Sequence, residues 1–323
     1  MASDTNYRLQ ALANSGVLDN VDARTRLAGS NVIELLLFSL GSSELYGINV
    51  FKVREITHTP AIARGPNLPP GVAGLVSLRG SIIPVISLSG LVAGAGAACS
   101  NELMMVTEFC GHVQGFLLHS IDRIVRVEWS AVRAPDAMLG TDNYISAVTQ
   151  LPDGTLVSVL DVEQVLATVY GEPDVPDLAP AARNDATVFF ADDSAVARRE
   201  IARVLDRLGV RHQHARNGRE AWERLQSLAA HAQLSGEPFS STIQLVLTDA
   251  EMPEMDGYVL TRNIKSDTRF NGVPVVMHSS LSSTANRAMG ASVGVDAYVA
   301  KFDSHVLAET LRPLLDAPAQ PAR

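Results

Sequence analysis

Hydrophobic and polar positions follow two different rhythms along the chain. Between residues 30 and 170, short apolar runs such as "NVIELLLFSL", "GLVSLRGSIIPVISL" and "TLVSVLDV" are separated by turn-forming residues. That spacing is typical of an all-β barrel or sandwich. Between residues 187 and 316, apolar runs of strand length alternate with amphipathic helical segments. This alternation predicts parallel β/α units, so the chain is expected to hold two domains of different class.

The segments outside these two regions are polar or rich in proline. Residues 171–186, "GEPDVPDLAPAARNDA", combine acids, prolines and alanines with no apolar period, and we predict that they form a linker. Residues 1–29 form a polar leader, and residues 317–323 are expected to be a disordered tail. The predicted domains are therefore 30–170 and 187–316.

The second region contains five strand-like runs: "TVFFA", "VRHQHA", "TIQLVLT", "GVPVVMHSS" and "DAYVAK". Helical patterns separate them, and Ser194 and Gly209 are the expected start and stop signals of the first helix. We predict an open, doubly wound (βα)5 sheet. In such sheets, the functional crevice lies at the carboxyl ends of the strands.

Charged and hydroxyl side chains stand at those strand ends. Asp192 and Asp193 follow the first strand, Asp249 the third, Ser279 the fourth and Lys301 the fifth. Carboxylates gathered in one crevice repel one another unless a cation lies among them, and Mg²⁺ favours carboxylate and phosphate oxygens. The Asp249 carboxylate could then attack a phosphoryl group and form an aspartyl phosphate, with the Lys301 ammonium beside it.

Each of these residues also has a simpler explanation. Asp192 and Asp193 could stabilise a helix N-terminus, Asp249 could cap a turn, and Lys301 could be a solvated lysine. Their joint placement at the ends of strands one, three and five makes a chance arrangement improbable. The hydroxyl is less well defined, because Ser280 directly follows Ser279 and a shift of one residue would exchange them.

The motifs "FFADDS", "LVLTDAEMPEMDGY", "VVMHSS" and "DAYVAK" resemble those of two-component receiver domains, in the same order. The chain departs from many receivers in having Lys301-Phe302 instead of Lys-Pro, and in its longer loop "QLSGEPFSST". The resemblance implies the flavodoxin-like strand order 2-1-3-4-5, with Asp249 as the phosphoacceptor and Lys301 as the family lysine. It also implies that Mg²⁺ is held by Asp192, Asp193, Asp249 and the backbone carbonyl of Glu251, and that Ser279 and Tyr298 are switch residues.

In the first region, "LRGSIIPVISL" places Arg79 and a glycine between two apolar runs. From the residues alone, a partner-binding arginine and a solubilising arginine in a hairpin turn are equally reasonable. The stretches "YGINVFKVREI", "PNLPPGVAGLVSLRGSIIPVISL" and "VSVLDVEQVL" resemble the CheW family of chemotaxis coupling proteins. The resemblance implies paired five-stranded SH3-like barrels and a receptor-contacting Arg79 with the acidic Glu55 near it. Ser87 stands where the family commonly has aspartate.

A CheW-like domain followed by a receiver resembles the CheV family. The resemblance implies a non-enzymatic adaptor that couples the cytoplasmic tips of chemoreceptors to the histidine kinase CheA. Its receiver would be regulated by Mg²⁺-dependent phosphorylation of Asp249, for adaptation or as a phosphate sink. The alternative is a Mg²⁺-dependent phosphohydrolase that uses Asp249 as nucleophile, which would leave the β domain without a role.

Composition restricts the class of partner. The net charge is −9, the pI is about 5.4 and no run of Lys or Arg is present, so nucleic-acid binding is not expected. The first residues lack the apolar core of a signal peptide, and the longest apolar stretches are too short to span a bilayer. We therefore expect a cytoplasmic protein that associates with membrane-bound receptor arrays without inserting into the membrane.

Overall fold

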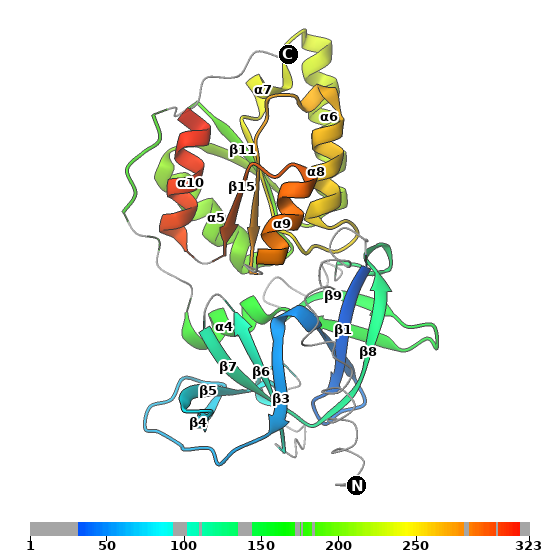
Figure 1. Ribbon diagram of the computed structural model, residues 1–323, viewed down its shortest axis with the longest axis vertical. Helices are drawn as coiled ribbons and strands as arrows, with labels where there is room; N and C mark the ends of the chain where they lie inside the picture. The colour runs from blue at the N-terminus through cyan, green and yellow to red at the C-terminus, as the bar shows by residue number, and fades with distance from the viewer. Residues whose placement is uncertain are drawn as a thin grey trace. The chain divides into compact units, whose positions relative to one another are not determined.

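The computed structural model describes residues 32–92, 102–109, 112–134, 144–171, 175, 177–182, 185–280, 284–301 and 303–316, so the predicted leader and tail lie outside the described residues. Contacts divide the chain into two compact units (Figure 1). The first, which we call the β unit, lies within Val32–Glu128 and Asp142–Gly171. The second, the α/β unit, contains the residues from Glu172 onward.

The β unit contains two five-stranded sheets. The first has the order β8 (Ser120–Glu128), β1 (Val32–Ser39), β2 (Leu45–Asn49), β10 (Leu156–Leu160) and β9 (Ile145–Gln150). The second has the order β3 (Val53–His58), β6 (Leu103–Phe109), β7 (His112–Leu118), β5 (Ser81–Ser87) and β4 (Val72–Leu78). Short helices α3 (Leu88–Leu91) and α4 (Val162–Tyr170) and the 3₁₀ turn η1 (Val50–Lys52) accompany them, whereas the 3₁₀ turn η2 (Trp129–Ala131) is grouped by its contacts with the second unit. The predicted pair of five-stranded β structures is confirmed.

Burial along the strands follows their sequence patterns. The apolar run of β1 is buried at every position between its two end residues, as expected for a strand that is covered on both faces. Strand β4 lies at a sheet edge and alternates instead, with Val76 buried while Leu75 and Ser77 on either side are exposed. The sequence therefore specifies an edge strand with one solvent face in the same hairpin that carries Arg79.

The α/β unit is built on one parallel sheet. Its order is β12 (Arg211–Ala215), β11 (Thr187–Ala191), β13 (Leu245–Thr248), β14 (Val275–Ser279) and β15 (Ala297–Ala300). This arrangement is the predicted order 2-1-3-4-5. The helices are α5 (Ala195–Leu208), α6 (Gly218–Ser235), α7 (Phe239–Thr242), α8 (Gly257–Ser266), α9 (Thr284–Val293) and α10 (Ser304–Asp316), with the 3₁₀ turn η4 (Thr268–Phe270) after α8.

Helices cover both faces of this sheet. Figure 1 shows α5 and α10 on one face and α6, α8 and α9 on the other. Neighbouring residues of β11 point to opposite faces, so Phe190 packs in the layer with α5 and α10 while Phe189 packs in the layer with α6 and α8. Burial of each phenylalanine contributes about 1.5–3 kcal/mol to stability. Among the described residues, no helix combines the length and apolar character needed to cross a bilayer.

Local signals set the helix ends and the long loop. Ser194 caps α5 by accepting a hydrogen bond from the Ala197 N–H, and Gly209 ends the helix in the left-handed conformation, both as predicted. The loop "QLSGEPFSST" contains the end of α6 and the short α7, and its Phe239 packs edge-to-face on Phe270 with ring centroids 4.8 Å apart. The longer loop is therefore anchored in the core.

Part of the predicted linker packs on the α/β unit. We call residues 177–182 the strap. The Arg312 guanidinium donates a 2.8 Å hydrogen bond to the Ala179 carbonyl, and an Asp316 carboxylate oxygen accepts one of 3.0 Å from the Ala182 N–H. Ala181 is buried in the core layer of α5 and α10, and its N–H donates to the Leu208 carbonyl. The strap therefore joins the ends of α5 and α10.

Candidate functional site

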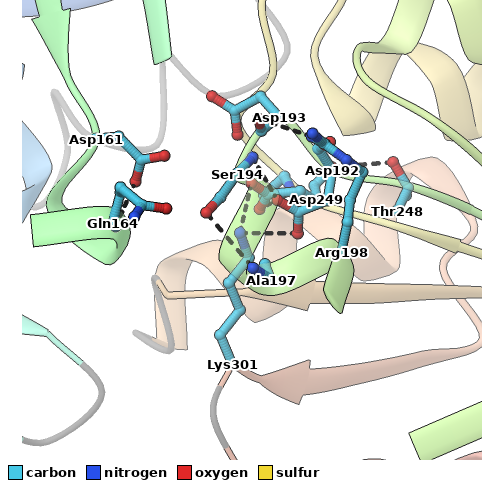
Figure 2. A network of polar contacts seen from close by, with 11 residues as sticks. Asp161, Gln164, Asp192, Asp193, Ser194, Ala197, Arg198, Thr248, Asp249 and Lys301 are labelled. Atoms are coloured by element: carbon cyan, nitrogen blue, oxygen red, sulfur yellow. Dashed lines mark hydrogen bonds and ion pairs between the residues drawn. The ribbon is translucent and has the colours of Figure 1, made fainter. Parts of the chain in front are cut away.

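An ammonium group lies between two buried carboxylates at the carboxyl edge of the parallel sheet. The Lys301 Nζ atom is 2.9 Å from an oxygen of Asp192 and 2.9 Å from an oxygen of Asp249 (Figure 2). All three side chains are buried, with at most 5% of any residue exposed. Buried charges of this kind are costly unless each is paired, and removing one partner is strongly destabilising. The structure therefore brings together three of the predicted site residues.

The sheet itself places these residues. Asp192 follows β11, Asp249 follows β13 and Lys301 follows β15, and the carboxyl ends of parallel strands meet at one edge. The backbone hydrogen bonding between neighbouring strands continues past the strand ends. The Asp249 N–H donates to the Ala191 carbonyl at 2.9 Å, and the Lys301 N–H donates to the Ser279 carbonyl at 3.0 Å. The backbone at each charged residue is therefore fixed by its neighbouring strand.

Arg198 holds the backbone of Asp192 and Asp193, the acidic pair that follows β11, and the sequence analysis did not predict this role. Its guanidinium donates hydrogen bonds to the carbonyl oxygens of Asp192, at 2.7 Å, and Asp193, at 2.9 Å (Figure 2). The Asp192 carboxylate also accepts a bond of 3.0 Å from the Ser194 N–H. The available signal was the position of Arg198, one helical turn after the Ser194 cap, which brings a long side chain back over the start of α5.

The three aspartates are arranged so that they could share a cation. One oxygen each of Asp192, Asp193 and Asp249 lies within 4.8 Å of the others. Asp193 is half-buried, whereas the other two are buried. A set of carboxylate oxygens that is open on one side suits Mg²⁺, which binds few protein oxygens and keeps several waters. The residues present therefore fit the metal, and the backbone carbonyl of Glu251 stays a predicted ligand.

Gly257 determines how closely the next helix approaches the site. A Cβ atom at this position would lie 1.9 Å from the Asp249 carbonyl oxygen. The Gly257 N–H instead donates a 2.9 Å bond to the Ala250 carbonyl, which folds the chain back at the start of α8. The glycine of "MDGY" is therefore required by contact with the backbone of Asp249.

The predicted switch residues lie beside this site. Ser279 is the last residue of β14 and is buried, whereas Ser280 is half-buried. Burial raises the pKa of the Tyr298 hydroxyl to about 12, while hydrogen bonding with Ser279 acts to lower it. The structure thus joins Ser279, rather than its neighbour, to Tyr298. The sequence analysis missed Tyr258, which is buried in the same cluster as Tyr298.

The predicted partner residues of the β unit meet at an exposed hairpin turn. The Arg79 guanidinium is 2.6 Å from a Glu55 carboxylate oxygen, with 78% of the Arg79 side chain exposed. Arg79 and Gly80 both have positive φ angles, 49° and 83°, as the favoured two-residue hairpin turns require. Ile82, two residues beyond the turn, is 74% exposed, and the sequence analysis did not single it out.

Ser87 occupies the N-cap position of α3. It precedes α3, but its side chain makes no capping hydrogen bond to the helix. Its hydroxyl is instead 3.2 Å from the Ser89 hydroxyl. An aspartate at this position would have an acceptor suited to the free N–H groups of α3, so this departure removes a local hydrogen bond and leaves the sheets intact.

Comparison with known proteins gives a match for each unit. The family model of the CheW-like domain matches residues 34–169, and that of the response regulator receiver domain matches residues 188–312. Chemotaxis protein CheV3 of Helicobacter pylori is 29% identical over 281 residues, which cover 84% of this chain and 89% of that protein. Chemotaxis protein CheW of Klebsiella aerogenes is 31% identical over 45% of this chain and 88% of its own length. Chemotaxis protein CheY1 of Helicobacter pylori is 33% identical over 40% of this chain and 95% of its own length.

Proposed function

The chain belongs to the CheV family of chemotaxis proteins, which join a CheW-like domain to a receiver domain, and from this premise we propose that phosphorylation of its α/β unit controls coupling by its β unit. It is a coupling adaptor, and nothing in the comparisons favours the alternative phosphohydrolase. The β unit would bind the cytoplasmic tips of chemoreceptors and the histidine kinase CheA. The protein would thereby work at membrane-bound receptor arrays.

The contact of Lys301 with both Asp192 and Asp249 carries the proposal for the α/β unit. An Asp249 oxygen would attack the phosphorus of a phosphohistidine donor, forming the P–O bond as the P–N bond breaks. The leaving imidazole nitrogen keeps the electron pair and takes a proton from water. Lys301 is positioned to pair with the additional negative charge on the phosphorylated side chain.

The acidic residues have a separate role. Asp192 and Asp193, with Asp249 and the Glu251 carbonyl, would hold Mg²⁺, which when bound neutralises charge on the phosphoryl oxygens. Arg198 keeps the backbone of the acidic pair in place through two carbonyl oxygens. The hydrogen bond between Ser279 and Tyr298 supports these residues as the switch that reports the phosphoryl group. Any loss of the phosphoryl group by hydrolysis would occur at this same site.

A phosphotransfer assay tests the proposal. The full-length protein is mixed with Mg²⁺ and a phosphorylated CheA-type kinase, and phosphate on the protein is followed over time. Asp249→Asn should abolish transfer, because it removes the attacking carboxylate and keeps the side-chain shape. Asp206→Asn, a matched change at an exposed carboxylate of the same unit, should transfer at the wild-type rate. Equal labelling of the Asp249 variant would reject the assignment.

A further inference from the structure

A buried carboxylate of α5 is bonded to the first residue of α10. The Ser304 hydroxyl donates a 2.9 Å hydrogen bond to a carboxylate oxygen of Glu200. Glu200 is 1% exposed and Ser304 is 6% exposed. Both helices cover the same face of the parallel sheet (Figure 1). The bond therefore joins, inside the α/β unit, two helices that are far apart in the sequence.

Packing alone does not explain a glutamate at this position. Glu200 lies on the buried face of α5, where its neighbours Ala197, Ile201 and Val204 are apolar and at most 1% exposed. A buried carboxylate costs free energy unless it is paired or hydrogen-bonded. An apolar side chain would complete the apolar face of the helix at lower cost. The glutamate therefore points to a need for a hydrogen-bond acceptor at this place.

The hydroxyl of Ser304 is not used to cap its own helix. That role belongs to Asp303, whose carboxylate accepts a 3.0 Å hydrogen bond from the Val306 N–H. The Asp303 carbonyl also accepts a 2.9 Å bond from the Leu307 N–H. The Ser304 hydroxyl instead bonds α5, so it holds the first turn of α10 against that helix.

The two joined helices carry the opposite charges of the site. Helix α5 follows the acidic pair, and its Arg198, two residues before Glu200, binds the backbone of that pair. Helix α10 follows Lys301, which comes three residues before Ser304. Residue 302 is phenylalanine, so no proline ring restricts the backbone directly after the lysine. The place of the ammonium relative to the acidic pair therefore depends on where α10 begins relative to α5.

We propose that Glu200 is a positioning residue for phosphoryl transfer, because by holding Ser304 it fixes the start of α10 and with it the Lys301 ammonium beside Asp249. This inference rests on the proposed function. The ammonium is 2.9 Å from an Asp249 oxygen, where it can pair with the charge that develops during the attack on phosphorus. Without the bond the start of α10 can shift, and a displacement of about 1 Å at a reacting centre costs up to about 100-fold in rate.

The test compares full-length variants that remove or keep the bond, at a temperature at which unfolding curves show each of them folded. Glu200→Met removes the acceptor and Ser304→Ala removes the donor, and each should slow Mg²⁺-dependent transfer by about 3- to 30-fold. Glu200→Gln keeps an oxygen acceptor and should stay within about twofold of the wild-type rate. The Glu200→Met/Ser304→Ala double variant should be no slower than the slower single variant, because all three lose the same bond.

Two readouts separate positioning from a general loss of structure. The slowing should be the same with a phosphorylated CheA-type kinase and with phosphoramidate, a small P–N donor that needs no docking surface. The Mg²⁺ affinity, followed by NMR titration, should stay within about twofold of the wild type, because the three aspartates keep their places. Weaker Mg²⁺ binding would show that the acidic pair has moved, and it would overturn the role assigned through Lys301.

Glu223→Met is the matched control. It makes the same chemical change at an exposed position of α6, a helix on the other face of the sheet (Figure 1). The transfer rate and the Mg²⁺ affinity should both equal those of the wild type. A transfer rate reduced as much as in Glu200→Met would attribute the effect to the lost charge and reject the bond as its cause.

The remaining outcomes are distinguishable. If Glu200→Met and Ser304→Ala transfer at the wild-type rate while Asp249→Asn does not transfer, the positioning role is wrong and the proposed function stands. Slowing of Glu200→Gln to the rate of Glu200→Met would also reject the hydrogen bond as the cause. If Asp249→Asn is labelled as fast as the wild type, the proposed function fails and the inference fails with it. Should Glu200→Met not fold, Ser304→Ala and Glu200→Gln still compare a lost bond with a retained one.

Discussion

The two units expose their candidate functional charges to water to opposite degrees. In the α/β unit, Asp192, Asp249 and Lys301 form a buried group in which each charge contacts an opposite one. In the β unit, Arg79 extends into solvent and touches Glu55 from an exposed turn. Buried groups suit chemistry, because low dielectric strengthens their interactions with a reacting group. An exposed guanidinium suits recognition, because a partner can reach and desolvate it.

This difference predicts how each unit responds to mutation. Removing one member of a buried ion group costs about 3–5 kcal/mol, since its partners are left charged and unpaired. Removing one member of an exposed pair costs about 0–1 kcal/mol in fold stability. Mutations in the α/β site should therefore change folding and chemistry together, whereas those at the β-unit turn should change binding alone.

Lys301→Met is the substitution with the largest expected effect. It leaves the carboxylates of Asp192 and Asp249 facing each other without the ammonium, so the free energy of unfolding should fall by about 3–5 kcal/mol. Added Mg²⁺ should restore part of the loss by replacing the missing positive charge. Urea unfolding with and without Mg²⁺ measures both effects.

Lys265→Met is the matched control, since the Lys265 ammonium pairs with Asp296 at a partly exposed site. It should cost about 1 kcal/mol or less, and Mg²⁺ should stabilise it only as much as it stabilises the wild type. Equal losses for the two lysine variants would contradict the distinction between the buried and the exposed charges.

Arg79→Ala should have an intermediate effect, and only on binding. We expect association with chemoreceptor cytoplasmic tips to weaken about 10-fold or more, as for an interface arginine, with the free energy of unfolding changed by about 0.5 kcal/mol or less. Arg54→Ala is the control, because Arg54 is an exposed arginine of the same sheet that pairs with Glu108. Pull-down with receptor tips measures binding by the two variants, and urea unfolding measures their stability. Unchanged binding by Arg79→Ala would remove this turn from the interface.

The smallest expected effect is on the pH dependence of stability, and it involves two aspartates whose pKa values are shifted in opposite directions. Burial raises the pKa of Asp256, the cap of α8, above its unfolded value of about 3.9. The stabilisation linked to its proton is therefore present below the unfolded pKa and lost as pH rises through the folded pKa. Asp256→Asn keeps an oxygen for the Val259 N–H and cannot ionise, so its stability relative to wild type should increase from pH 4 to pH 7.

Asp267→Asn should show the reverse trend. Its half-buried carboxylate is hydrogen-bonded by Arg269, which lowers the pKa of Asp267, so its contribution to stability is present above the unfolded pKa and lost as pH falls. The variant should therefore lose stability relative to wild type between pH 4 and pH 7. Urea unfolding at both pH values measures the two trends, and trends of equal sign would contradict the assigned shifts.

The sequence was most informative where regular backbone geometry determines position. Parallel strands deliver their last residues to one edge, so the pattern alone was enough to predict that Asp192, Asp249 and Lys301 converge. The same rule could not predict Arg198 or Tyr258, because a helical side chain's contacts depend on its rotamer and on the turn that it reaches. In the β unit, the Arg-Gly sequence was enough to predict the turn. The exposure of Ile82 could not be predicted, because it depends on which face of the sheet is covered.

The Pro- and Ala-rich segment before the parallel sheet shows a further limit. Its composition indicated a linker, and the domain limits at 171 and 186 stay a prediction. Yet Ala181 packs in the core layer, and two side chains from distant α10 bind the strap backbone. Backbone carbonyl and N–H groups are present at almost every residue, so no pattern of residue types predicts that side chains will bind them here.

The strap bears on how this protein should be dissected for experiments. A fragment that starts at Thr187, where the regular sheet begins, would lack Ala181 from the apolar layer and the backbone groups that Arg312 and Asp316 bind. Val175 already packs against the same layer. An excised receiver for labelling or crystallisation should therefore begin no later than Val175; otherwise any instability measured would arise from the truncation and not from the chemistry under study.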